Sequence, residues 1–169
     1  MENRKRLEEL PSKTLSYRRM CTNDIPTVAQ MRMNQLKDEG AQEDFDLISY
    51  LTEFYEKNLK NGRYVSWLAV CGEEIVATSG MSFTEKPPYY ANPSGKIGIL
   101  SSMYTKKEYR RKGIARVLLK KVMDEAKNNG CGVVHVTASD MGVLLYSDYG
   151  FLRHKNFLQY VFKNEMNGI

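Results

Sequence analysis

The sequence has little of several features that would assign it to a particular class of protein. Its 169 residues include only three cysteines, two histidines and one tryptophan. Cys21, Cys71 and Cys131 are odd in number, far apart and outside any CxxC or Cys/His spacing, which argues against a disulfide framework and a zinc site. They are expected to be reduced thiols. Neither His135 nor His154 has a nearby carboxylate pattern, so both are expected to be structural.

Long apolar runs are lacking as well. No window approaches the roughly 18 apolar residues of a membrane helix, and the N-terminal MENRKRLEEL is charged where a signal peptide would be apolar. We therefore expect a cytoplasmic protein with no membrane partner. There is no repeat, low-complexity tract or linker, and the length suits one domain. The expected organisation is an N-terminal tail at residues 1–14 and a single domain at residues 15–169.

The composition that remains is typical of a soluble globular protein, with 42% hydrophobic and 27% charged residues. The net charge is +5, but the stretch KKEYRRKGIARVLLKK at residues 106–121 has eight basic residues and one acidic residue. The rest of the chain therefore carries about −2. A basic surface of this kind is typical of binding to nucleic acid, a membrane surface or a phosphorylated small molecule, and a solvated helix face is the alternative.

Apolar periodicity and turn residues predict ten elements in the order β α α β β β α β α β. Asn23 or Asp24 is expected to cap the first helix, while Gly40 and Gly62 end the first two helices. This order indicates an α/β domain with a mixed sheet. The predicted elements are a strand at 15–20, helices within 22–40 and 44–62, a β-hairpin at 63–85 with its turn at Cys71 to Glu73, a strand at 96–105, a helix at 112–129, a buried strand at 132–139, a short helix at 140–150 and a last strand at 156–163.

The glycine of the basic stretch, Gly113, lies between the end of a strand and the first turn of a helix. A helix N-terminus offers unpaired amides and the positive end of the helix dipole, and a glycine lets a pyrophosphate come close. Ala115 keeps the next turn narrow. The spacing fits neither GxxxxGK[ST] nor GxGxxG, and reads as R-x-x-G-x-A. Basic side chains on both sides can add charge-assisted contacts: Arg110, Arg111, Lys112 and Arg116.

The context of this motif resembles the GNAT superfamily of acyl-CoA-dependent N-acyltransferases. The matching segments are ILSSMYT, KKEYRRKGIA, RVLLKKVMDEAKNNG, VVHVTAS and LLYSDYGF, and the resemblance runs from about Ser16 to Lys163. It implies a GNAT-like single α/β domain, with a mixed, mostly antiparallel sheet flanked by helices and two strands splayed apart at the CoA site. It also implies acetyl-CoA as cosubstrate, no metal, and an amine as acceptor.

The resemblance further implies the roles of individual residues. Tyr146 is expected to protonate the departing CoA thiolate as a general acid. Lys107 stands where many members have proline, and Ser139 where many have asparagine, so Ser139 would offer the pantetheine one hydroxyl in place of an amide. The main chain of Met103, Tyr104 and Thr105 is expected to pair with the pantetheine arm. The CoA pyrophosphate would be held by the backbone amides of Arg111, Lys112, Gly113, Ile114, Ala115 and Arg116.

The reaction expected from these roles is direct transfer. A deprotonated amine attacks the acetyl carbonyl, the strand amide of Met103 stabilises the oxyanion, and Tyr146 protonates the thiolate. Either Glu85 or a water relay would deprotonate the amine. Between Asp38 and Glu56 lie seven acids and no Lys or Arg, which favours a small cationic acceptor. Solvated faces of two helices are the alternative reading of these acids.

Two other classes of function remain open from the sequence. A basic nucleic-acid-binding domain would use the lysine-rich helix against phosphates, but the sequence has no recognisable nucleic-acid-binding module, and no nucleic-acid partner is expected. A non-catalytic acyl-CoA sensor would keep the pyrophosphate loop without depending on Tyr146. The oligomeric state is open between a monomer and a homodimer.

Overall fold

The computed structural model describes residues 14–162, which form two compact units divided between Thr137 and Ala138. The single domain expected over residues 15–169 therefore stays a prediction. Of the expected tail, residues 1–13 lie outside the described residues.

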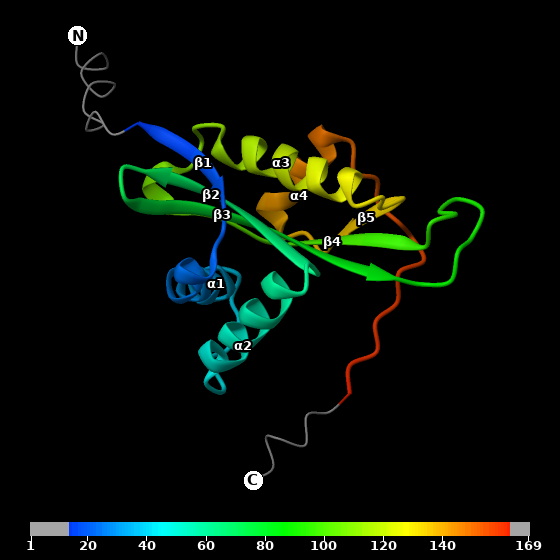
Figure 1. Cartoon of the computed structure of the whole chain (residues 1–169), viewed down its shortest axis with the longest axis horizontal. Helices are drawn as coiled ribbons and strands as arrows, with labels where there is room; N and C mark the ends of the chain where they lie inside the picture. The colour runs from blue at the N-terminus through cyan, green and yellow to red at the C-terminus, as the bar shows by residue number, and fades with distance from the viewer. Residues whose placement is uncertain (1–13, 163–169) are drawn as a thin grey trace. The chain divides into compact units, whose positions relative to one another are not determined.

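The first unit is built on a five-stranded sheet with the strand order β1-β2-β3-β4-β5 (Figure 1). The strands β1 to β4 are antiparallel to one another in sequence order, whereas β5 runs parallel to β4. The predicted mixed, mostly antiparallel sheet is confirmed. The strands are β1 (Leu15–Arg19), β2 (Tyr64–Cys71), β3 (Glu74–Glu85), β4 (Lys96–Thr105) and β5 (Val133–Val136).

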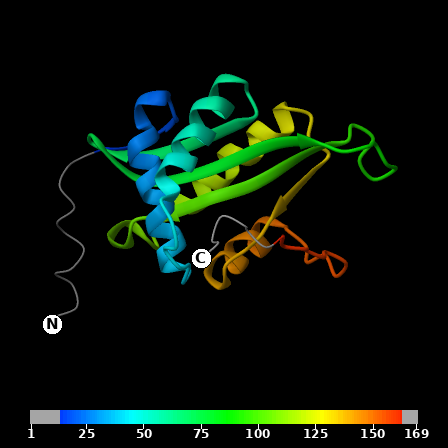
Figure 2. The ribbon, with the colours of Figure 1, turned by 90° about the horizontal axis from the view of Figure 1, so that it is seen from below.

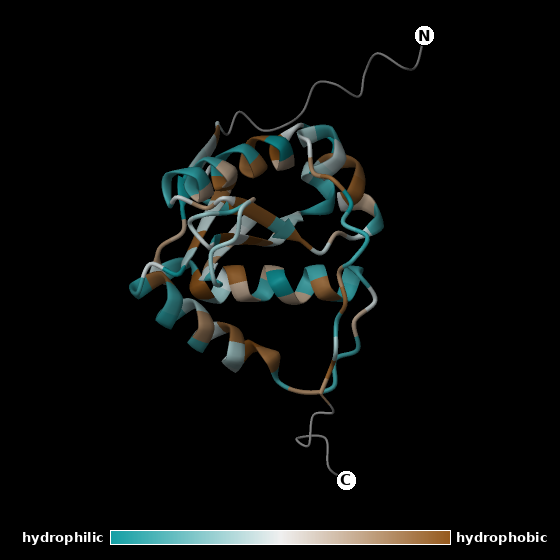
Figure 3. Ribbon diagram, turned by 90° about the vertical axis from the view of Figure 1, so that its right-hand side faces the viewer, coloured by the Kyte–Doolittle hydropathy of each residue, from teal (hydrophilic) through white to brown (hydrophobic). Residues whose placement is uncertain are grey.

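Helices cover both faces of this sheet. The helices α1 (Ile25–Asp38) and α2 (Leu47–Lys60) lie on one face, and α3 (Ile114–Asn128) lies on the other (Figures 1 and 2). Bands of hydrophilic and hydrophobic residues alternate along the helices (Figure 3), as expected for amphipathic helices that cover a sheet. Each face has its own buried cluster, with Tyr55 and Leu68 on the α1/α2 side and Val76 and Leu118 on the α3 side.

A polar contact fastens α3 to the first two strands. The carboxylate of Glu125 on α3 accepts the indole N–H of Trp67 at 2.8 Å and two guanidinium N–H groups of Arg19 at 2.7 and 2.8 Å. The ammonium of Lys121 lies 4.1 Å from the centroid of the Trp67 ring. One carboxylate thus connects β1, β2 and α3.

The helix ends agree with those predicted from the sequence, with one exception. Gly40 and Gly62 have φ of 83° and 72°, as expected for residues that end helices. The side chain of Asp46 caps α2 by accepting the amide of Ile48 at 3.0 Å. The cap predicted for α1 is wrong: Asp24 does precede α1, but its side chain makes no cap hydrogen bond to that helix. Instead Asp24 accepts two guanidinium N–H groups of Arg18, because β1 ends beside it.

The second unit contains α4 (Asp140–Tyr149) and an irregular segment up to Phe162. Gly150 ends α4 in the left-handed conformation, with φ of 114°. The strand predicted at 156–163 is wrong for its described residues, since residues 156–162 form no strand. Alternating apolar residues give a segment one apolar face, but a strand also needs a neighbouring strand to pair with its backbone N–H and C=O groups. The strand predicted at 132–139 forms only as β5 and is half-buried, with His135 exposed.

Candidate functional site

The pairing of β3 with β4 contains an irregularity at the residues predicted to bind the acetyl group. Thr78 pairs with Tyr104 and Gly80 pairs with Ser101, so that Ser102 and Met103 together face a single residue of β3. Two residues opposite one is a β-bulge, which leaves a residue of the bulged strand outside the ladder. Ser102 has φ of 53°, unusual for a residue other than glycine. The bulge therefore turns the main chain at Met103 away from regular pairing.

Just before the bulge, β4 leaves its other neighbour, β5. The parallel pairing with β5 joins Ile97–Leu100 to Val133–Val136 and then ends, whereas β4 continues to Thr105. Within the described part of the first unit, no strand pairs with Ser101–Thr105 on the β5 side. The predicted splaying of the two strands is confirmed. An open strand edge of this kind can take a further extended, amide-containing chain.

The open edge leads into the loop that precedes α3. A short 3-10 helix (Lys107–Tyr109) begins the loop, and both Arg111 and Gly113 have positive φ, of 63° and 80°. Gly113 is the N-cap residue of α3, and a Cβ placed on it would meet nothing within 4 Å. The first amides of α3 thus face open space with no capping side chain from Gly113. An uncapped helix start can bind an anion, and the pyrophosphate contacts expected of residues 111–116 stay a prediction.

The basic side chains around this loop have different positions. Arg110 is held by three contacts: its Nε donates to the carbonyl of Thr105 at 2.8 Å, a terminal nitrogen donates to Asp38 at 2.9 Å, and its guanidinium lies over the Tyr104 ring. The Lys112 ammonium donates to the Glu108 carbonyl at 2.9 Å. Arg110 and Lys112 therefore stabilise the loop itself. The basic side chains exposed in the loop and the first turn of α3 are those of Lys107, Arg111, Lys112 and Arg116.

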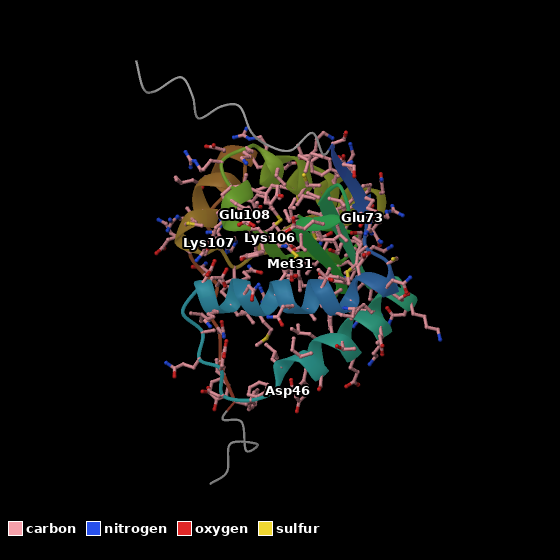
Figure 4. All side chains as sticks on the ribbon, turned by 90° about the vertical axis from the view of Figure 1, so that its left-hand side faces the viewer. Met31, Asp46, Glu73, Lys106, Lys107 and Glu108 are labelled. Atoms are coloured by element: carbon pink, nitrogen blue, oxygen red, sulfur yellow. The ribbon has the colours of Figure 1, made fainter. Side chains whose placement is uncertain are left out.

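The loop is also tied to the C-terminal end of α1. Figure 4 shows Lys106, Lys107 and Glu108 beside one end of that helix. Asp38 accepts Arg110 and lies 3.5 Å from the Lys107 ammonium. The hydrogen bond from Arg110, together with the charge of Lys107, lowers the pKa of Asp38 below its usual value. Lys107, at the position where proline was expected, thus contributes to a contact that the sequence did not predict.

The structure does not bring Glu85 near Met103. Glu85 pairs with Lys96, the first residue of β4, and Met103 lies seven positions further along that strand. At about 3.3 Å per residue these positions are roughly 23 Å apart, far beyond the reach of direct proton transfer. Glu85 instead lines a cavity of about 440 Å³ at the other end of β4, together with Arg63 and Lys96. The expectation that Glu85 is the base does not fit this geometry.

The acids between Asp38 and Glu56 have different positions as well. Asp38 is paired with the loop, and Asp46 is occupied at the start of α2, where it also accepts the Ser49 hydroxyl at 2.7 Å. The Glu39 carboxylate accepts the Gln35 amide at 3.0 Å. Several of the seven acids therefore have structural partners that the sequence did not reveal. Those that remain exposed without such a role are Glu43, Asp44, Glu53 and Glu56.

In the second unit, Tyr146 lies on α4. Its ring packs against Phe151 with centroids 5.6 Å apart, and a Cβ at Gly142 would lie 2.9 Å from the ring. Gly142 therefore makes room for the Tyr146 ring, a role that the sequence analysis missed. The Ser139 hydroxyl accepts the amide of Gly142 at 3.2 Å and so caps α4. The catalytic role of Tyr146 and the pantetheine contact of Ser139 stay predictions.

Comparison with known families decides between the classes left open by the sequence. The model of the acetyltransferase (GNAT) family matches residues 28–151. The chain belongs to the GNAT family. The structure of a predicted acetyltransferase with acetyl-CoA from Clostridium acetobutylicum is 32% identical in sequence, with a TM-score of 0.85 over 88% of this chain and 96% of that chain.

Two more distant structures share the GNAT fold. A GCN5-related N-acetyltransferase from Ralstonia eutropha is 21% identical, with a TM-score of 0.80 over 88% of this chain and 99% of that chain. An aminoglycoside N-acetyltransferase in complex with CoA is 15% identical, with a TM-score of 0.69 over 92% of this chain and 99% of that chain. No curated protein sequence matches this GNAT chain.

The GNAT protein is thus an acyltransferase, and acetyl-CoA is its cosubstrate. The residues fit this cosubstrate, because the open edge of β4 and the uncapped start of α3 offer main-chain partners for an amide-containing arm and a pyrophosphate. Within residues 14–162, no cluster of three or more His, Cys, Asp or Glu is placed to hold a metal ion. None of the helices in that range has the length and apolarity of a membrane span.

Proposed function

We propose that this protein is an N-acetyltransferase that moves an acetyl group from acetyl-CoA to a primary amine by direct transfer. The observation that carries the proposal is the continuous main-chain surface of the first unit. It begins at the bulge beside Met103, follows the unpaired edge of β4 to Thr105, and ends at Gly113. The amides of Arg111 to Arg116 would hold the pyrophosphate, and the main chain of Met103 to Thr105 would pair with the pantetheine arm.

The proposed chemistry needs a polarised carbonyl and a proton donor. The amine nitrogen attacks the acetyl carbon, the Met103 amide stabilises the oxyanion, the carbon–sulfur bond breaks, and Tyr146 protonates the thiolate. The amine, with an ordinary pKa near 10, must first lose a proton. Since Glu85 is far along β4 from Met103, we assign that step to a water relay.

The acceptor proposed for the enzyme is a small cationic amine, such as a polyamine, an aminoglycoside-like compound or a basic peptide end. Four exposed acids support it: Glu43 and Asp44 between α1 and α2, and Glu53 and Glu56 on α2. Carboxylates around a binding cleft concentrate cations, an effect that salt screens. One structure with the same fold is an aminoglycoside N-acetyltransferase. We also propose that the enzyme acts in the cytoplasm, as a monomer or a homodimer.

The test is a screen of amines, polyamines, aminoglycosides, amino acids and peptides with acetyl-CoA, followed by the release of free thiol. A matched pair of acceptors, one cationic and one with an added carboxylate, is then compared at low and high salt. The proposal expects a higher kcat/KM for the cationic acceptor, with a preference that shrinks as salt rises. Binding of acetyl-CoA with no turnover of any amine would overturn the proposal that the acceptor is a primary amine.

A further inference from the structure

The residue at the centre of the β4 bulge is held in an unfavourable conformation. Ser102 has φ of 53° and is 6% exposed, so its strained backbone is buried in the first unit. A non-glycine residue keeps a positive φ only where its surroundings hold it there, and such residues cluster at functional sites. Ser102 directly precedes Met103, the residue whose amide we assign to the thioester carbonyl. Whatever holds Ser102 therefore sets the direction of that amide.

The carbonyl of Ser102 is held by the neighbouring strand. The Thr78 hydroxyl on β3 donates to this carbonyl at 2.9 Å, and Thr78 itself is 2% exposed. Thr78 is also the last residue of β3 in regular register before the bulge. A buried hydrogen bond is costly to break, because the carbonyl would lose its partner with no water in reach. Thr78 thus fixes one side of the bulge.

On β2, Tyr64 packs against the β3 side of the bulge. A Cβ at Gly80, which pairs with Ser101 next to the bulge, would collide with the Tyr64 hydroxyl, so glycine is required there. This buried hydroxyl has no hydrogen-bond partner among the described residues. Tyr64 therefore fills space beside the bulge, and the hydrogen bond that holds Ser102 comes from Thr78.

We propose that Thr78 is a positioning residue for the acetyl transfer. By holding the carbonyl of Ser102, it keeps that residue in the left-handed conformation and aims the Met103 amide at the thioester carbonyl. Thr78 touches no reacting atom and acts only through Ser102. This inference rests on the proposed function, since it takes the Met103 amide as the group that stabilises the oxyanion.

The first test uses acetyl-CoA labelled with carbon-13 at the acetyl carbonyl. A hydrogen bond from the Met103 amide moves the carbonyl resonance downfield when the wild-type enzyme binds the label. Thr78→Val keeps the shape of the side chain but removes the donor, and we expect it to lose most of this shift. Thr78→Ser keeps the hydroxyl and is the matched control, expected to retain the shift. The affinity for unlabelled CoA, which has no acetyl carbonyl, should change less than about twofold, because the pyrophosphate amides are untouched.

The second test separates positioning from stability. Thr78→Val should lower kcat by about tenfold, less than the hundredfold or more that loss of an oxyanion donor costs. The KM for acetyl-CoA should change little, and Thr78→Ser should retain kcat. A residue that served only the packing of the core would alter the Tm and leave kcat unchanged.

The outcomes distinguish this inference from the proposed function. A full carbonyl shift or an unchanged kcat in folded Thr78→Val would overturn the inference and leave the transferase intact. Absence of the shift in the wild type would overturn it as well, since the Met103 amide would then not contact the carbonyl. If no amine is acetylated but the shift is present and depends on Thr78, the proposed function fails while the positioning of the bulge stands.

Discussion

Two neighbouring regions of the first unit differ in how they are prepared to bind. The loop that leads to Gly113 presents main-chain amides, and its conformation is set by two residues with positive φ, Arg111 and Gly113. The segment from Asp38 to Asp46 presents carboxylates, several of which are already used to hold the fold. A site made of amides is fixed by the backbone, whereas a site made of side chains depends on what each side chain already contacts.

The two regions meet at Asp38. The sequence predicted Arg110 as a phosphate ligand because of its charge. Its guanidinium instead donates hydrogen bonds to Asp38 and to the carbonyl of Thr105. The same contact removes Asp38 from the acids available to a cationic acceptor. One ion pair thus lowers the free charge of both regions. The comparison can be sharpened by substitutions that alter the backbone in one region and the side chains in the other.

The largest effect is expected from Gly113→Val. The side chain would enter the open space in front of the α3 amides and block the pyrophosphate, so CoA affinity should fall by about a hundredfold or more, the loss of two charge-assisted hydrogen bonds. The φ of 80° adds strain of about 1–2 kcal/mol. Calorimetric titration with CoA measures the affinity, and thermal unfolding measures the strain.

The chain offers a matched control for that strain. Gly130 follows the other end of α3, has φ of 79°, and a Cβ there would meet only the Lys96 side chain at 3.8 Å or more. Gly130→Val should therefore cost similar stability and leave CoA binding unchanged. Equal losses of CoA affinity in the two variants would show that strain, and not a blocked pyrophosphate, is responsible.

The next effect is expected from Tyr146→Phe in the second unit. Loss of one proton donor should lower kcat by about ten to a thousandfold, while acetyl-CoA binding stays unchanged. The ring would keep its contact with Phe151, so the fold should tolerate the change. Steady-state kinetics and CoA titration measure the two quantities. Turnover at the wild-type rate would show that Tyr146 only packs, or that water replaces it.

The contrast between backbone and side chains also explains which features of the structure could be predicted from the sequence. The positions of Gly40 and Gly62 predicted two helix ends, because each glycine takes a conformation that other residues avoid. The mixed sheet and the splayed strands followed from the GNAT resemblance and are confirmed. These features are local, or are shared by the whole family.

The features that the sequence missed depend on contacts between distant residues. The bulge at Ser102 requires Thr78 from β3, and the occupation of Asp38 requires Arg110, which is 72 positions away in the chain. The last strand was expected from apolar alternation, yet a ladder needs a partner that alternation does not supply. Glu85 was expected near the reacting groups because it ends a strand. The register of β3 on β4 instead pairs it with Lys96, at the end of β4 away from Met103.

A smaller effect is expected at the other end of α1, at Asp24. The hydrogen bonds from Arg18 lower the pKa of Asp24 to about 2, so the pair stabilises the fold above pH 4 and is lost as the pH falls from about 4 towards 2. Because Arg18 is half-exposed, we expect Asp24→Asn to lower the free energy of unfolding by only about 1 kcal/mol at pH 7. Denaturant unfolding at pH 7 and pH 2.5 measures it. An equal difference between the proteins at both pH values would contradict the assignment.

The smallest effect is expected from Asp38→Asn, which removes the carboxylate shared by Arg110 and Lys107. The pairs are partly exposed, and Arg110 keeps its hydrogen bond to the Thr105 carbonyl, so the loop should hold its conformation. If backbone amides bind the pyrophosphate, the affinity for CoA should change no more than about threefold. Asp46→Ala is the control, since it loses the cap of α2 at a cost of about 1 kcal/mol and should leave CoA binding unchanged. A loss in Asp38→Asn as large as that in Gly113→Val would mean that side-chain charge, and not the backbone, organises the CoA site.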